Sequence, residues 1–434
     1  MRVLVTGAYG FIGSHIAIGL AQRGHSVVAC GRDVAFGKRL LPAFEWLACD
    51  FNRDVDVASW LPRLKGIDAV INCVGILQSS MRDSAITVHE RAPRALFAAC
   101  QQASVPRVVH ISAPGVDAAD PTGYSRTKAA IETHLASMDL NAIIVRPSLV
   151  VARGSYGGTS LIRGLAGLPG VIPLPEGGRQ LFWPLTIDDL VEAVCRLAAD
   201  PDVAKRVLDL GGPQELSLRE IVGAYRRWLG FDEGRVITVP RWAMRLLALA
   251  GDVSNWFGGR TALTTTSVLQ LQKASVASAA AARHAIGREP TALSDFLAAS
   301  PSAVQDRWHA RLYFLRPVLR LILGAFWFVS GLIALLPAGA DKAAGILRSA
   351  GLGAEAPLLV AVGGVVDVLL GLPLILGLWV RTVGALQLVV AAFYLIAATV
   401  LTGPALWLDP LGPLVKLLPI MVATAVMIAI EPER

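Results

Sequence analysis

The last 118 residues of this chain are poor in charged residues. They contain six Lys or Arg and six Asp or Glu, although charged residues make up 17% of the whole sequence. Four apolar segments lie within them, each with about the 20 residues that a helix needs to cross the hydrocarbon of a bilayer. The pattern predicts four membrane-spanning helices and excludes both an intrinsically disordered chain and a purely soluble protein. The segments are 317–336, 357–380, 383–401 and 411–430.

The 316 residues before them have a different pattern, in which short β-branched runs alternate with helical ones. Such alternation predicts right-handed crossovers and a parallel sheet with helices on both faces. We therefore expect an α/β fold of the doubly wound, Rossmann type over 1–260, a helical connector over 261–316 and an all-α membrane domain over 317–434. The expected strands are 3–6, 26–30, 46–49, 69–74, 107–112, 142–146 and 206–210, and the expected helices are 13–23, 55–64, 84–103, 124–138, 187–199, 218–229, 241–257 and 264–274.

A glycine-rich turn follows the first expected strand. Gly7, Gly10 and Gly13 form a Gly-x-x-Gly-x-x-Gly pattern that opens a helix. A side chain at Gly7 or Gly10 would hold the backbone away from a diphosphate, whereas the helix N-terminus favours an anion. The pattern predicts a dinucleotide site, with a purely structural turn as the alternative. The candidate binding residues in this turn are Gly7, Tyr9, Gly10, Phe11, Ile12 and Gly13.

The end of the second expected strand bears on which dinucleotide binds. An NAD site usually has a carboxylate here for the ribose hydroxyls, whereas the 2′-phosphate of NADP needs a cation. Arg32 therefore favours NADP(H), with Lys38 and Arg39 as helpers, while the adjacent Asp33 keeps NAD(H) open as the alternative. A solvated Arg32 without a ligand is the third interpretation. Asp50, after the third strand, would accept a hydrogen bond from the adenine amino group or cap a helix.

Tyr124 and Lys128 form a Tyr-x-x-x-Lys pair in an expected helix. A spacing of four residues puts both side chains on one helical face, where the ammonium would lower the pKa of the phenol. A tyrosine prepared in this way can donate or remove a proton as hydride moves to or from a carbonyl carbon. Ser112, at the end of an expected strand, would hydrogen-bond the substrate oxygen. The three residues are the candidate catalytic group, with an ordinary surface pair as the alternative for Tyr124 and Lys128.

Roughly residues 1–300 resemble the short-chain dehydrogenase/reductase superfamily. The resemblance is strongest to its extended and atypical branches, which include the nucleotide-binding accessory subunit of respiratory complex I. It implies that Ser112, Tyr124 and Lys128 are catalytic, that Lys128 also holds the nicotinamide ribose, and that Gly75 and Ala113 lie near the nicotinamide. The motifs behind it stand in the family's order at 6–13, 50, 72–75, 88–89, 108–112, 124–128, 146–147 and 187–189.

Two positions depart from this family's pattern. Residues 72–75 read Asn-Cys-Val-Gly where active members often have Asn-Asn-Ala-Gly, and His89 stands where many extended members have Asn. These departures put the proton relay in doubt, because the atypical branch includes members that bind nucleotide without known turnover. His89 would either replace a relay group or, as we expect, lie on a helix surface.

The apolar C-terminal part resembles the DoxX-like family of four-helix membrane proteins through residues 319–331 and 364–377. Small residues such as Gly364 would allow close contact between helices. Asp367 lies in the middle of a span, where a carboxylate is expected to face the bundle interior. It would either contact a proton or a quinone or, as the alternative, have a role in packing. The expected aromatic anchors at the membrane interface are Trp327, Trp379 and Trp407.

Basic residues indicate the orientation of these spans. Six Lys or Arg flank the ends that would be cytoplasmic, against three at the outer ends, and such an excess marks the cytoplasmic side. We expect a multi-pass protein of the inner (cytoplasmic) membrane with its dinucleotide domain in the cytoplasm. The amphipathic segment 241–257 would rest on the bilayer surface or dock on the soluble domain. Basic runs interleaved with aromatics are absent, which argues against nucleic acid, and the cysteines and histidines have no metal-site spacing.

Two functional hypotheses follow. The first is a membrane-anchored NAD(P)(H)-dependent oxidoreductase, or less favoured an epimerase, that acts on a carbonyl or alcohol. Its expected lid over 151–178 and 182–184 has no charge cluster suited to a sugar nucleotide or phosphate, so an unknown, lipid-like small molecule is the favoured substrate. The second is a non-catalytic NADP(H)-binding scaffold or sensor subunit with a partner in a membrane complex.

Overall fold

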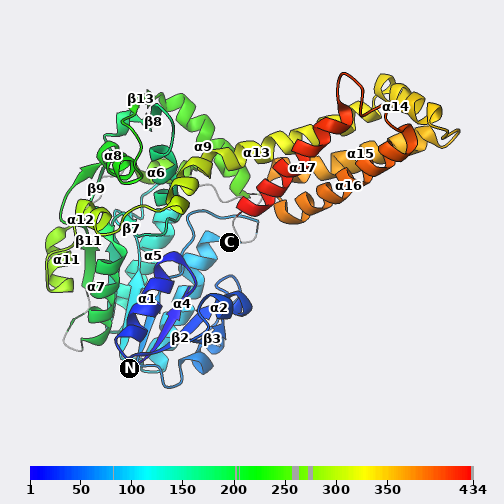
Figure 1. The fold of residues 1–434 in the computed structure, drawn as a ribbon. Coiled ribbons are helices and arrows are strands. Elements are labelled where there is room, and N and C mark those ends of the chain that lie inside the picture. Colours follow the sequence, from blue (N-terminus) through cyan, green and yellow to red (C-terminus); the bar gives the residue numbers. More distant parts are fainter. Residues whose placement is uncertain (82, 201–202, 205, 257–262, 272–276, 432–434) are drawn as a thin grey trace. The chain divides into compact units, whose positions relative to one another are not determined.

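The computed structural model describes residues 1–434 except 82, 201–202, 205, 257–262, 272–276 and 432–434. These residues form two compact units, of which the first reaches Ala310 and the second continues from Arg311. The first unit carries the sheet, and the second carries the apolar helices (Figure 1).

A seven-stranded sheet forms the centre of the first unit, in the order β11-β6-β5-β4-β1-β2-β3. All neighbouring strands are parallel, which confirms the predicted Rossmann-type fold. The strand order reverses beside β1, and ligands of such sheets bind at this point, beyond the carboxyl ends of the strands. The strands are β1 (Arg2–Thr6), β2 (Ser26–Gly31), β3 (Glu45–Ala48), β4 (Ala69–Asn72), β5 (Arg107–Ile111), β6 (Ala142–Pro147) and β11 (Arg206–Leu210).

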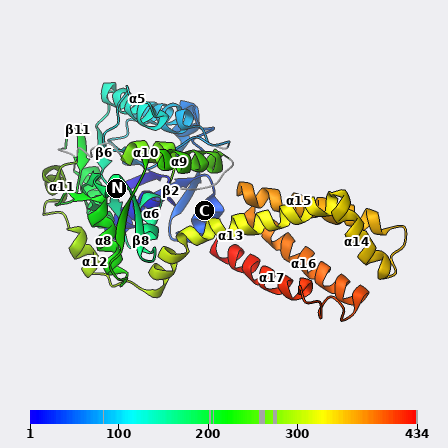
Figure 2. The same cartoon turned by 90° about the horizontal axis from the view of Figure 1, so that it is seen from above.

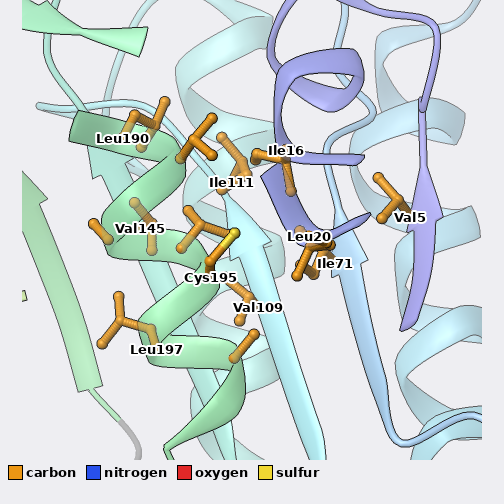
Figure 3. Packing of buried hydrophobic residues seen from close by; sticks show 14 of the residues in the cluster. Val5, Ile16, Leu20, Ile71, Val109, Ile111, Val145, Leu190, Cys195 and Leu197 are labelled. Carbon is orange, nitrogen blue, oxygen red and sulfur yellow. The ribbon is translucent and has the colours of Figure 1, made fainter. Parts of the chain in front are cut away.

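Helices cover both faces of the sheet, as the alternating pattern predicts. On one face, Leu20 of α1 and Leu190 of α7 share a buried cluster with Val109 of β5 (Figure 3). On the other face, Phe97 of α4 and Ile131 of α5 belong to a second buried cluster. Because both faces are covered, a ligand must reach the sheet at its edge. The helices are α1 (Phe11–Gln22), α7 (Ile187–Ala199) and α11 (Ala279–Ile286) on the first face, and α3 (Val57–Trp60), α4 (Ala92–Gln102) and α5 (Gly123–Ser137) on the second.

Several local elements differ from the sequence-based expectation. Strand β4 ends before its expected limit because the side-chain oxygen of Asn72 accepts a hydrogen bond from the Val74 N–H at 3.2 Å and closes a turn. The helix expected over 84–103 opens with a π-helical turn, η2 (Thr87–Arg91), and a 3-10 turn, η1 (Leu61–Leu64), follows α3. The short helix α2 (Val34–Leu40) was not expected.

The stretch 151–178, expected to form part of a lid, contains α6 (Gly158–Ala166) and β8 (Val171–Pro175). Strand β8 pairs in parallel with β13 (Arg235–Val239), so its partner lies far along the chain and no local pattern indicates it. Smaller elements complete this part: β7 (Val150–Val151), η3 (Glu176–Gly178), β9 (Leu181–Phe182), β10 (Leu185–Thr186), β12 (Leu216–Ser217), α8 (Leu218–Trp228), α9 (Arg241–Trp256), α10 (Thr265–Leu271) and α12 (Leu293–Ala298).

Four C-terminal helices are long and apolar enough to cross a membrane, as predicted: α13 (Val304–Leu335), α15 (Ala356–Leu376), α16 (Val380–Thr402) and α17 (Pro413–Ile430). Helix α13 begins well before the expected start at Pro317, because this proline lies inside the helix rather than in its first turn. The additional helix α14 (Pro337–Ser349) was not expected.

Glycines bring α13 and α15 into backbone contact. A Cβ atom at Gly331 would lie 2.5 Å from the Gly364 carbonyl oxygen, and one at Gly371 would lie 2.4 Å from the Phe328 nitrogen. The expected close contact at Gly364 is therefore present. Small residues at such positions let van der Waals packing hold helices together in lipid.

Candidate active site

The three glycines of the turn between β1 and α1 have no room for side chains. Gly7 adopts a left-handed conformation with φ of +67° and accepts a hydrogen bond from the Gly10 N–H at 2.8 Å. A Cβ atom at Gly13 would lie 2.2 Å from the Gly7 carbonyl oxygen, well inside van der Waals contact. Gly10 is the N-cap residue of α1 and has no side chain that could bond to the N–H groups of the first turn. These N–H groups are therefore available to an anion.

A cavity of about 150 Å³ opens beside this turn, at the carboxyl ends of β1 to β4. Most of the predicted dinucleotide-binding residues line it, namely Gly7, Tyr9, Gly10, Arg32, Asp50 and Gly75. Phe11, Ile12 and Gly13 lie behind the turn, at the start of α1, and Lys128 lies next to Gly75. The structure thus brings together residues from four strand ends that the sequence separates.

Tyr9 supports the end of β2 with its side chain. Its hydroxyl oxygen accepts hydrogen bonds from the backbone N–H groups of Arg32, at 3.2 Å, and Asp33, at 3.3 Å. Its ring stacks on Trp46 and lies so close to Gly31 that a Cβ there would be 2.4 Å from a ring carbon. The tyrosine therefore fixes the backbone that presents Arg32 to the cavity.

The charges near Arg32 differ from those that the sequence alone indicates. The Asp33 carboxylate accepts a hydrogen bond from the Phe36 N–H at 2.8 Å and caps α2, so it is engaged away from the cavity. Arg32 instead forms a salt bridge of 2.5 Å with Asp83, which also accepts from the Asn52 amide at 2.7 Å. Sequence analysis missed Asp83 because nothing in the local pattern links it to a residue 51 positions away.

Asp50 closes a turn after β3 rather than capping a helix. Its carboxylate accepts from the Asn52 N–H at 3.0 Å and lies 3.7 Å from the Arg53 guanidinium. The N-cap residue of α3 is Asp56, so the helix-capping alternative for Asp50 is wrong. Asp50 borders the cavity, as an adenine contact requires.

Lys128 lies between this cavity and the end of β5. Its ammonium donates a hydrogen bond to the Ile111 carbonyl at 3.0 Å, and a Cβ at Gly75 would lie 3.5 Å from its Nζ. Burial lowers the pKa of Lys128 to about 8. Ser112 follows Ile111 and is buried, and its Oγ has no hydrogen-bond partner among the residues that the structure describes. An unpaired buried hydroxyl at this point suits a substrate oxygen.

Tyr124 is not the acidic phenol that the Tyr-x-x-x-Lys spacing predicts. Burial, and next the charge of Glu132, raise the pKa of Tyr124 to about 12. The Lys128 ammonium donates its hydrogen bond to the Ile111 carbonyl instead. Tyr124 therefore keeps its proton at neutral pH.

Glu132, missed by sequence analysis, extends the face of α5 that carries Tyr124 and Lys128. Its spacing of four residues from Lys128 could have indicated it. The Arg146 guanidinium of β6 donates to both Glu132 oxygens, with Nε at 3.0 and 3.1 Å. This ion pair fixes the helix that carries Tyr124 and Lys128 against the sheet.

His89 is buried, so the expectation that it lies on a helix surface is wrong. Its Nε2 accepts from the Ile76 N–H at 3.0 Å, and its Nδ1 lies 3.0 Å from Thr127 Oγ1. Burial, and next the Lys128 charge, lower the pKa of His89 to about 3, so it is neutral. Both ring nitrogens are engaged, and His89 connects the backbone beyond Gly75 to α5.

A second polar cluster lies inside the bundle of apolar C-terminal helices. The Tyr394 hydroxyl donates to Asp367 Oδ1 at 2.9 Å, so Asp367 has a partner within the bundle. Trp327 stacks on Tyr394 with 6.4 Å between ring centroids and is only 3% exposed. The expectation that Trp327 is an interfacial anchor is therefore wrong, whereas Trp379 is exposed at the start of α16.

Comparisons with known proteins identify both parts of the chain. Residues 3–211 match the model of the NAD dependent epimerase/dehydratase family, and residues 324–425 match the model of the DoxX-like family. The 3-diazoavenalumate denitrifying reductase of Streptomyces sp is 30% identical over 320 residues, which cover 67% of this chain and 96% of the reductase. Subunit 9 of the NADH dehydrogenase (ubiquinone) 1 alpha subcomplex of mouse (Mus musculus) mitochondria is 25% identical over 230 residues.

The match to the mouse subunit covers 50% of this chain and 58% of the relative, so the chain spans little more than half of that protein's length. Among solved structures, UDP-glucuronic acid 4-epimerase from Bacillus cereus, in complex with UDP-glucuronic acid and NAD, has a TM-score of 0.51 and 19% identity. It covers 73% of this chain and is itself covered completely. At this identity the likeness concerns the fold.

Proposed function

Because the chain belongs to the NAD dependent epimerase/dehydratase family and ends in a DoxX-like domain, we propose that it is a membrane-anchored NAD(P)(H)-dependent oxidoreductase. One observation carries the proposal. Gly75 lines the dinucleotide cavity, and a Cβ at this residue would lie 3.5 Å from Lys128 Nζ. The glycine turn, the cavity and the candidate catalytic lysine are therefore continuous, as hydride transfer to a bound substrate requires.

The residues present suit a dinucleotide. The turn at Gly7 and Gly10 admits only backbone, and the first N–H groups of α1 would hold the diphosphate. Lys128 would hold the nicotinamide ribose, and Ser112 would orient the substrate carbonyl through its unpaired hydroxyl. The bound cofactor supplies or accepts the hydride.

Tyr124 would be the proton donor. With its pKa at about 12, the phenol is protonated at neutral pH and can donate to the oxygen of a carbonyl as hydride reaches the carbon. The product is an alcohol, and the phenolate regains its proton from solvent.

NADP(H) is the dinucleotide that we favour, with NAD(H) as the alternative. Arg32 lies at the end of β2, and the nearby Asp33 carboxylate is engaged in capping α2. Asp83 competes with a 2′-phosphate for the Arg32 guanidinium, so the preference is moderate. The Bacillus cereus epimerase was solved with NAD, which agrees with the dinucleotide site but concerns a different protein.

A hydrophobic substrate and a cytoplasmic orientation complete the proposal. The four apolar helices keep the enzyme in a membrane, where lipid-like carbonyl compounds or alcohols concentrate. The excess of basic residues at one set of helix ends favours the inner membrane with the first unit in the cytoplasm. The proposed domain limits are 1–260, 261–316 and 317–434.

A non-catalytic NADP(H)-binding subunit of a membrane complex is the second candidate. The hydrogen bond from the Ile76 N–H to His89 Nε2 favours it, because a backbone amide does not pass on its proton and many family members have a relay group at the position of His89. The mouse relative is a subunit of an NADH dehydrogenase.

The two candidates are separated by measuring binding and turnover in the same preparation. We expect NADPH fluorescence to change when the full-length protein is added in mild detergent, and a panel of hydrophobic aldehydes, ketones and quinones to oxidise the bound NADPH. Tyr124→Phe should retain binding and lose turnover. Tyr225→Phe is the matched control, because Tyr225 is a fully buried tyrosine of α8 that does not line the cavity. Equal activity of Tyr124→Phe and wild type would refute the mechanism, and binding without turnover for every acceptor would favour the subunit.

A further inference from the structure

Helix α9 exposes five large apolar side chains in a continuous row. Trp242 is 67% exposed and Trp256 is 54% exposed, and the three aliphatic residues between them on this face are exposed as well. Successive members are separated by four or three positions, so all lie within about 80° of the helix circumference. The α9 stripe consists of Trp242, Leu246, Leu249, Val253 and Trp256.

The opposite face of α9 is already buried in the first unit, and it carries smaller side chains. Met244, Ala248 and Gly251 are its buried residues. Helix α10 lies beside α9 (Figure 2), and Asp252 accepts from the Thr265 N–H at 3.0 Å. The helix is therefore held in place by a few buried side chains and by hydrogen bonds of Asp252, while the face with its large apolar side chains is uncovered. An uncovered row of this kind marks an interaction surface.

Lipid is the occupant that these residues suit. A tryptophan stands at each end of the stripe, and tryptophan is the residue most typical of membrane–water interfaces. Arg241 and Arg245 flank the stripe at its N-terminal end, where they would meet anionic headgroups. Arg241 also pairs with Glu176 at 2.8 Å, so Arg245 contributes the larger part of this attraction.

A second copy of the chain suits the stripe less well. The spacing of four and three resembles a coiled-coil seam, but the stripe covers only about two heptads, whereas a stable coiled coil needs about three or four. An interfacial helix has no such length requirement. In addition, the four apolar helices of the same chain already hold the first unit near a bilayer.

We propose that the α9 stripe is a membrane-contact surface, which inserts into the headgroup region of the bilayer that the C-terminal helices cross. The contact is made by side chains of the first unit and is additional to the membrane-spanning helices.

This surface adjoins the dinucleotide cavity. Asp252 of α9 accepts from the Gln78 amide at 3.1 Å, and the Trp256 carbonyl accepts from the Met81 N–H at 3.4 Å. The loop that contains Gln78 and Met81 also carries Asp83, at the rim of the cavity. A stripe in contact with lipid places this rim at the bilayer surface, where a lipid-like substrate of the proposed oxidoreductase would enter. The membrane contact itself does not depend on that activity.

The test uses nitroxide labels on the full-length protein in nanodiscs of phosphatidylcholine and phosphatidylglycerol. Leu249→Cys places a label in the stripe, and Leu40→Cys, at an exposed leucine of α2, is the matched control. Four of the five native cysteines are buried and Cys73 is half-buried, so a Cys73→Ala background, which keeps only the buried native cysteines, directs the label to the introduced site. Continuous-wave EPR then measures accessibility to oxygen, which concentrates in lipid, and to a water-soluble nickel chelate.

The label at position 249 should be at least about 5-fold more accessible to oxygen, relative to the nickel chelate, than the label at position 40. Three outcomes would overturn the proposal: equal ratios at the two positions, protection of position 249 from both relaxants, and dipolar broadening between labels on two copies. The measurement needs no dinucleotide or substrate. A protein that failed to bind NADPH would still give the expected ratio, so failure of the proposed function and failure of this contact are distinguishable.

Discussion

Replacing Lys128 by methionine should stabilise the first unit at neutral pH. Burial lowers the pKa of this lysine to about 8, from an unfolded value of about 10.4. At about 1.4 kcal/mol for each pKa unit, the buried ammonium costs roughly 3 kcal/mol of folding free energy. The mutation also removes the hydrogen bond to the Ile111 carbonyl, which contributes about 1 kcal/mol. The expected net gain is therefore about 2 kcal/mol.

The sign of the effect changes with pH. Below pH 8 both the folded and the unfolded protein carry the Lys128 proton, so the full cost is present. Between about pH 8 and 10.4 the unfolded chain binds more protons, and the stability of the wild type rises with pH. Above this range the lysine is neutral in both states, and Lys128→Met should be destabilising by about 1 kcal/mol, through the lost hydrogen bond.

Thermal and urea unfolding of the full-length protein in detergent, without dinucleotide, at pH 6.5 and pH 10.5 would measure both effects. Lys65→Met, at an exposed lysine, is the control and should change stability by the same small amount at both pH values. A Lys128→Met protein that is less stable than wild type at pH 6.5, or a difference that does not depend on pH, would refute the reasoning that a charge is buried here at a cost to stability.

Three further substitutions test other parts of the account. Gly13→Ala should lower dinucleotide affinity by at least 10-fold in calorimetric titration. The reason is that the added Cβ would lie 2.2 Å from a backbone oxygen, and overpacking of this kind costs about 1–3 kcal/mol. Gly158→Ala is the control, and it should bind dinucleotide normally because the space around its Cβ is open. Asp83→Asn should release Arg32 and raise the ratio of the NADPH affinity to the NADH affinity several-fold, which corresponds to about 1 kcal/mol. An unchanged ratio of the two Kd values would argue against a contact between Arg32 and the 2′-phosphate. Gly371→Ala should lower the Tm of the membrane helices, because its Cβ would meet the backbone of α13 at 2.4 Å, and an unaltered melting curve would mean that this contact is unimportant.

The features that sequence analysis predicted correctly are those that depend on local pattern. Gly7, Gly10 and Gly13 follow a strand directly and open a helix, so the turn and its freedom from side chains can be inferred from neighbouring residues. The four apolar helices are equally local, since length and composition decide them.

The features that it missed depend on contacts between distant segments. The sequence indicates a free cation at Arg32, but the fold places Asp83 in a salt bridge with it. The sequence likewise predicts a surface position for His89, but His89 lies in a π-helical turn and is buried beneath α5. Trp327 lies inside the bundle because Tyr394, on another helix, stacks on it. In each case the deciding partner is remote in sequence, and hydrophobic periodicity carries no information about it.

The pKa of Tyr124 shows the same limit at the level of chemistry. The spacing of Tyr124 and Lys128 predicts an acidified phenol, but burial and the Glu132 charge raise its pKa instead. The direction of the Lys128 ammonium, which bonds to the Ile111 carbonyl, is set by the strand that α5 packs on and not by the helix alone.

The central claim is that the glycine turn holds a dinucleotide beside Lys128 in a membrane-anchored protein. Native mass spectrometry of the full-length chain, released from a mild detergent after incubation with NADPH or NADH, tests it most directly. The account predicts one dinucleotide for each chain, with NADPH retained to the higher activation energy, and loss of both adducts in Gly13→Ala. A spectrum of the wild-type chain without either adduct, at dinucleotide concentrations up to about 1 mM, would contradict it.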